Sequence, residues 1–140
     1  IGNFDNVKSS TQRLLQAGIT VSIFIDPDEQ QITKAKETGA TVIELHTGKY
    51  ADTSGAEQAK ELERIKTAAK FAYSIGLKVN AGHGLHEGNV EAIAEILEIA
   101  ELNIGHAIVA EAVFKGWKAA IQDMRTLMLH ARQRAMNQKH

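Results

Sequence analysis

The strongest constraint on the fold is a repeated order of strand and helix patterns punctuated by single glycines. The runs at 19–25 and 41–47 are rich in β-branched residues and have apolar side chains on both faces, as strands of a covered parallel sheet do. Gly18, Gly39 and Gly76 end helical patterns directly before a strand pattern. The sequence therefore predicts an α/β fold in which helices connect parallel strands.

Hydrophobic periodicity and capping residues give the expected elements. Strands are expected at 19–25, at 41–47, from Lys78 onward, and at 102–108. Helices are expected at 3–16, 26–38, 56–75, 90–100, 109–114 and 117–136. In the second helix, Asp26 is the expected cap and Pro27 the first helical residue. The polar segment 48–55 is expected to be a loop of the kind that often carries function.

Two long helices have a predicted inward face. For the helix at 56–75 that face consists of Ala59, Leu62, Ile65, Ala69 and Ala72, with Glu61 elsewhere. For the helix at 117–136 it consists of Trp117, Ile121, Met124, Leu127 and Ala131. The basic residues Arg132, Arg134 and Lys139 are expected to form a solvated terminus.

The length of the chain bounds the architecture. A chain of 140 residues with 44% apolar residues is long enough to fill a core, and we take 1–140 as part of a single domain. Repeated crossovers produce either an open doubly wound sheet or a closed barrel, and the short helix at 109–114 favours the barrel. A TIM-type (β/α)8 barrel needs about 250 residues, so the four strand-helix units here would form about half of one.

Charge and cysteine content exclude several classes of protein. Sixteen basic and seventeen acidic residues give a net charge of -1, which disfavours nucleic acid and anionic membranes as partners. The chain has no cysteine, so it has neither disulfides nor a thiolate metal site, and we expect a cytoplasmic protein. No apolar run reaches the roughly 18 residues of a membrane span.

Glu44 is the first candidate for chemistry, because it lies in mid-strand between Ile43 and Leu45. It is either paired with a neighbouring lysine or kept for proton transfer or charge stabilisation, and we favour the second interpretation. His46 shares its face of the strand. A metal-assisted lyase or hydrolase that uses Glu44, His46, His83 and His106 is a less favoured alternative.

His83 and His106 each follow a glycine at a predicted strand end. The glycines Gly82, Gly84 and Gly105 let the backbone approach a ligand, and amides that lead into a helix attract anions. Together they predict a phosphorylated small molecule with an imidazole beside it. The remaining histidines, which are His86, His130 and His140, are expected at the surface.

Three segments carry a family resemblance that covers nearly the whole chain. IELHTGKYAD, LKVNAGHGL and ELNIGHAIVAEAVFKG, in this order, resemble the carboxyl-terminal half of pyridoxine 5'-phosphate synthase. The resemblance implies the last four strand-helix units of an eight-stranded barrel with additional helices, assembled as a homo-octamer. It also implies a reaction without metal or organic cofactor, in which 3-amino-2-oxopropyl phosphate and 1-deoxy-D-xylulose 5-phosphate form pyridoxine 5'-phosphate, phosphate and water.

The same resemblance gives roles to five residues. His83 matches the proton donor, and Glu44 matches the transition-state stabiliser. Gly84, Gly105 and His106 match contacts to the aminoketone phosphate. The family's other catalytic groups come from earlier strands, so these 140 residues alone are expected to be inactive.

The start of the chain at Ile1 rather than Met leads us to expect further coding sequence upstream. A non-catalytic reading also stays open. In that reading the half-barrel is a phosphate-binding or assembly module whose strand edges pair with another copy.

Overall fold

The protein is described by a computed structural model over residues 3–138, and this part has four strands and seven helices. The elements follow in the order α1 (Phe4–Gln16), β1 (Ser22–Ile25), α2 (Glu29–Glu37), β2 (Val42–His46), α3 (Gly48–Asp52), α4 (Gly55–Ser74), β3 (Lys78–Gly82), α5 (Val90–Ala94), β4 (Ile99–Asn103), α6 (His106–Lys115) and α7 (Trp117–Asn137). None of the helices within 3–138 has the length and apolar character needed to cross a membrane.

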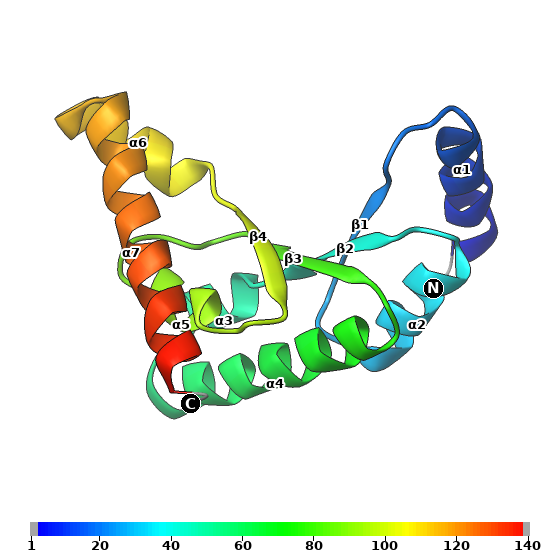
Figure 1. Cartoon of the computed structure of the whole chain (residues 1–140), viewed down its shortest axis with the longest axis horizontal. Coiled ribbons are helices and arrows are strands. Elements are labelled where there is room, and N and C mark those ends of the chain that lie inside the picture. The colour runs from blue at the N-terminus through cyan, green and yellow to red at the C-terminus, as the bar shows by residue number, and fades with distance from the viewer. Residues whose placement is uncertain (1–2, 139–140) are drawn as a thin grey trace.

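The four strands form one parallel sheet in the order β1-β2-β3-β4. Each strand therefore pairs with the next one along the chain, as right-handed crossovers through helices produce. Figure 1 shows α4 running along one side of the sheet, with α1 at one end of the molecule and α6 and α7 at the other. The predicted α/β class is confirmed, and the order is compatible with part of a barrel. The closed barrel itself stays a prediction.

The core lies between the sheet and the helices packed on one of its faces. Ile43 and Leu45 of β2 and Val79 of β3 are fully buried there. Ile32 of α2 and Ile65 of α4 pack into the same cluster. Burying side chains of this size supplies about 1.5–3 kcal/mol each, so this face anchors the sheet.

The opposite face of the sheet carries several polar side chains and is open at β1 and β4, whereas Asn80 of β3 is buried. Phe24, Glu44 and Asn80 are in register across β1, β2 and β3, and Glu101 of β4 pairs with Asn80. Phe24 is 53% exposed, and Glu101 also reaches solvent. The expectation that helices cover both faces is therefore wrong for β1, whose pattern is half exposed. Glu44 reaches this open face from mid-strand and is only partly buried.

Several predicted boundaries are wrong near the ends of the strands. The first strand begins at Ser22, not at residue 19. The fourth strand is Ile99–Asn103 rather than 102–108, because the preceding helix ends at Ala94 and Ile99 pairs with Val79 of β3. The register of the pairing between β3 and β4 shifts between Val79 and Asn80 of β3. As a result, His106 is the first residue of α6 and not part of a strand.

Two further differences concern the loops after β1 and β2. Asp28, not Asp26, caps α2, since its carboxylate accepts a hydrogen bond from the Gln31 amide at 3.0 Å. The segment predicted as a loop at 48–55 contains the short helix α3, in which Tyr50 is buried. Asp26 is therefore not the cap of α2, and a helix lies beside the end of β2.

The inward faces of two helices also differ from the predicted ones. In α4, Glu61 is 3% exposed although it was predicted to lie elsewhere, while Ala59 is exposed. In α7, Met124 and Ala131 are buried as predicted, whereas Trp117 and Ile121 are exposed.

Of the basic residues near the end of α7, Arg134 is exposed as predicted, whereas Arg132 is partly buried. Arg132 donates to the carbonyls of Ile96 and Ile99, and Arg134 pairs with Glu91 and Glu95. Lys139 lies outside the described residues.

Candidate active site

A cavity of about 600 Å3 opens at the carboxyl ends of the strands. Parallel-sheet proteins place their ligands at this end. Its walls include Glu44 from β2, His83 and Gly84 from the loop after β3, and Gly105 and His106 at the start of α6. All five residues predicted to be catalytic or to bind the substrate therefore line one cavity, whereas His46 and Gly82 do not line it. His86, which was expected at the surface, is exposed and lines it too, and His130 is exposed on α7.

His83 sits in a backbone conformation that L-residues rarely adopt, with φ at +83°. The buried hydroxyl of Thr47 lies 2.6 Å from the carbonyl oxygen of His83 and 2.8 Å from that of Gly82, and the hydroxyl shares its one proton between the two oxygens. The Thr47 amide also donates to the Gly82 carbonyl, at 2.9 Å. Thr47 thus holds the turn that carries the imidazole, a role that sequence reasoning missed.

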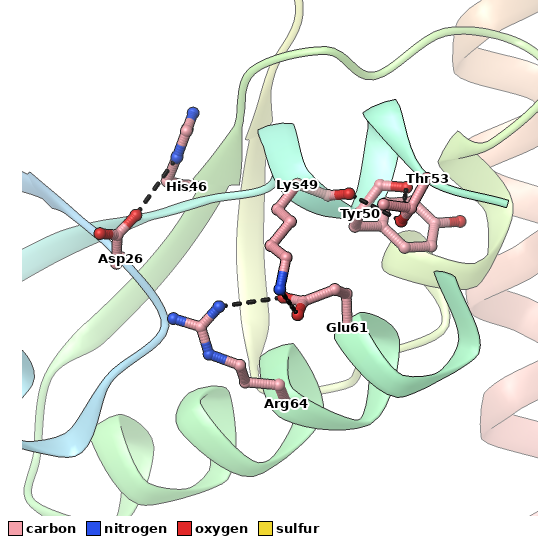
Figure 2. Close-up of polar contacts among 7 residues, drawn as sticks. All are labelled: Asp26, His46, Lys49, Tyr50, Thr53, Glu61 and Arg64. Carbon is pink, nitrogen blue, oxygen red and sulfur yellow. Dashed lines mark hydrogen bonds and ion pairs between the residues drawn. The ribbon is translucent and has the colours of Figure 1, made fainter. Parts of the chain in front are cut away.

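The ring of His46 packs against the ring of His83, with centroids 4.7 Å apart and planes at 61°. Its other side meets Phe24 at 5.1 Å, and its Nδ1 lies 3.3 Å from Asp26 Oδ1 (Figure 2). Asp26 can make this contact because Asp28 provides the cap of α2. His83 is therefore supported from behind by an oriented imidazole.

Glu44 reaches Asn103 at the end of β4, and Asn103 Nδ2 donates to Glu44 Oε2 at 2.7 Å. The partner of the carboxylate is thus a neutral amide, where the alternative reading had expected a lysine. The negative charge is held but not cancelled. Asn103 also lines the cavity. It lies within NIGHAI, next to residues that the sequence did single out, and only the sheet register reveals its contact with Glu44.

The start of α6 contributes amide groups to the cavity wall. The first bond of this helix runs from the Val109 amide to the Gly105 carbonyl at 3.0 Å, and the amides before it have no acceptor within a helix. Apart from Gly105 and its two chain neighbours, no heavy atom of the described residues lies within 4 Å of the position that a Cβ on Gly105 would take. This open end of a helix is suited to an anion.

Gly84 is constrained more tightly than Gly105. Its φ is +76°, and a Cβ there would come within 2.6 Å of Ala51 Cβ in α3. The loop after β3 can therefore pass close to α3 only with glycine at this position.

A buried carboxylate of α4 fixes α3 (Figure 2). Glu61 of α4 accepts from Lys49 at 2.6 Å and from Arg64 at 2.9 Å. The hydrogen bond from Lys49 lowers the pKa of Glu61, with Arg64 adding to the effect, and together they outweigh the burial that would raise it. Gly48, next to Lys49, packs so closely that a Cβ there would lie 2.7 Å from His46 Nε2. The position of α3 is thus linked to that of the histidines.

Tyr50 provides the second anchor of α3. Its hydroxyl donates to the Asn89 carbonyl at 2.8 Å, and burial raises its pKa. This bond ties α3 to the segment that precedes α5.

The metal alternative receives no support from this geometry. Within residues 3–138, no three or more carboxylate or imidazole side chains come close enough to share one ion. Glu44, His46, His83 and His106 are arranged along the cavity and behind it rather than around a common centre.

Comparison with known families agrees with the motifs that line the cavity. Residues 1–130 match the family model described as pyridoxal phosphate biosynthesis protein PdxJ, so nearly the whole chain is covered. The chain therefore belongs to the PdxJ family, whose members act in pyridoxine 5'-phosphate biosynthesis.

Proposed function

We propose that this chain forms part of the active site of a pyridoxine 5'-phosphate synthase. The reaction condenses 3-amino-2-oxopropyl phosphate with 1-deoxy-D-xylulose 5-phosphate and releases phosphate and water. The observation that carries the proposal is the shared cavity, in which a carboxylate, an imidazole and a helix amino terminus face the same space. The family match supports the same biosynthetic role.

The amino end of α6 would hold the phosphate of the aminoketone. Gly105 leaves open space there, and His106 can donate to a phosphate oxygen from the first position of the helix. Gly84 would contact the same substrate from the opposite loop. A substrate held in this way has already lost its translational and rotational freedom before the ring closes, which lowers the barrier to that step.

His83 would act as the proton donor. Imine formation and the dehydrations that follow require a proton for each departing oxygen, and the ring nitrogen of a histidine can donate one. Glu44 would stabilise the iminium charge as it develops, which suits a carboxylate whose partner, Asn103, leaves its charge intact.

The chain would supply one wall of the site only. The family's remaining catalytic groups belong to strands that precede those seen here, so we propose that these 140 residues are inactive alone. The complete barrel and its assembly as a homo-octamer also remain predictions. Size measurement of the purified protein, with and without added phosphate, separates a defined assembly from aggregation through the edges of β1 and β4.

The test of the function is made in the complete enzyme. We expect His83→Asn to lower kcat by about a hundredfold or more, the usual contribution of general acid catalysis, while KM for either substrate changes only a few-fold. His130→Asn, on the exposed side of α7, is the matched control and should leave both constants unchanged. An unchanged kcat for His83→Asn would remove the imidazole from the mechanism, and absence of pyridoxine 5'-phosphate formation by the unaltered enzyme would refute the function.

A further inference from the structure

Glu44 and Asn103 meet although a whole strand separates them. Glu44 belongs to β2 and Asn103 to β4, with β3 between them in the sheet. The residue of β3 that pairs with Asn103 is Gly82, which also pairs with His46 on the other side. The Glu44 side chain therefore reaches Asn103 by crossing the surface of the sheet above Gly82.

Gly82 makes this crossing possible because it has no side chain. A Cβ on Gly82 would lie 2.4 Å from Glu44 Oε1, 2.8 Å from the carbonyl oxygen of Asn103 and 3.1 Å from its Cβ. The backbone does not demand glycine here, since Gly82 is not among the glycines with positive φ. The sequence suggested that Gly82 lets the backbone approach a ligand. In the structure, the Glu44 carboxylate and the backbone carbonyl of Asn103 fill this space.

Asn103 supplies the donor that fixes the carboxylate at the far side of this gap. A carboxylate only accepts hydrogen bonds, so the amide nitrogen must face Glu44 Oε2. Oε1 stays over Gly82, at the cavity wall that His83 and His106 share. A lysine in place of Asn103 would hold the carboxylate equally well but would neutralise it. An amide restrains the group and leaves its charge available to a developing cation.

We infer that Gly82 and Asn103 are positioning residues that hold the Glu44 carboxylate in the cavity during the reaction. The inference rests on the proposed function and adds two residues to it. Gly82 provides the space across the middle strand, and Asn103 provides the donor at its end. Neither needs to touch a substrate, because both act through Glu44.

The test uses Asn103→Ala in the complete enzyme. The Asn103 side chain is exposed, so its removal should leave the fold intact. Loss of a hydrogen bond to a charged group should lower kcat by about ten- to a hundredfold, with KM for the aminoketone phosphate within about threefold. Asn103→Asp should be slower still, since it replaces the donor with a second negative charge. Glu101→Ala is the matched control on the same strand and face, and its kcat should stay within about twofold.

A double-mutant comparison shows whether Asn103 acts through Glu44. If it does, Glu44→Ala with Asn103→Ala should be no slower than Glu44→Ala alone. Multiplying losses would show that Asn103 acts independently and would overturn the inference, as would an unchanged kcat in Asn103→Ala. Failure of the proposed function gives a different result, because then the unaltered enzyme forms no product or Glu44→Ala keeps full activity.

Gly82→Ala tests the space above β3. We expect it to lower kcat at least as far as Asn103→Ala does, because the added methyl group displaces the carboxylate. If Gly82→Ala fails to fold, the Asn103 variants decide the matter alone.

Discussion

Replacing Glu61 with glutamine should destabilise the protein far more than its position on a long surface helix suggests. The Glu61 side chain is 4% exposed, whereas those of its partners Lys49 and Arg64 are 58% and 40% exposed. Glu61→Gln removes the carboxylate that accepts one hydrogen bond from Lys49 of α3 and another from Arg64 of α4 itself, and it leaves both cations free to be hydrated.

The expected loss lies between two limits. Removing one partner of a fully buried pair costs about 3–5 kcal/mol, whereas a surface pair contributes about 0–1 kcal/mol. Because only the carboxylate is buried here, we expect Glu61→Gln to lower the free energy of unfolding by about 1–3 kcal/mol at pH 7. Glu63→Gln is the matched control on the same helix. It breaks an exposed pair with Lys66 at 2.7 Å and should cost less than about 0.5 kcal/mol.

The loss should also depend on pH. Since the folded protein lowers the pKa of Glu61 from its ordinary value of 4.5, the ionised carboxylate stabilises the fold fully above that value. The stabilisation should decline as the pH falls from 4.5 and vanish below the lowered pKa of the folded state. The difference between the two proteins in urea unfolding should therefore shrink in the same window. Equal costs for Glu61→Gln and Glu63→Gln, or a difference that does not change down to pH 3, would refute this reasoning.

Two other contacts give predictions of the same kind. Thr47→Val keeps the shape of the side chain but removes the hydroxyl that donates to the His83 carbonyl, so we expect about 1–3 kcal/mol lower stability by urea unfolding and a reduced kcat in the complete enzyme. A kcat equal to that of the unaltered enzyme would show that the turn keeps its conformation without this bond. Arg132→Met removes donors to the carbonyls of Ile96 and Ile99, at 2.9 and 2.5 Å, and should cost about 1–3 kcal/mol in the same assay, whereas the exposed Arg125→Met should cost almost nothing. Because burial lowers the pKa of Arg132, a variant as stable as the unaltered protein would mean that the lost bonds had only offset its desolvation.

The sequence by itself determined the α/β class, the parallel direction of the strands and five of the residues that line the cavity. These features depend on local patterns: apolar periodicity, glycines before strands, and glycine-histidine pairs at strand ends. The motifs that contain Glu44, His83 and His106 also revealed the family, which the match over residues 1–130 confirms.

Only the tertiary structure decided which side chains meet. The contact between Glu44 and Asn103 depends on the order and register of three strands, and the burial of Glu61 depends on where α3 packs. The reassigned start of β4 follows from its pairing with β3 rather than from its own composition. Such contacts join residues far apart in the chain, and a local pattern holds no information about them because it reflects only near neighbours.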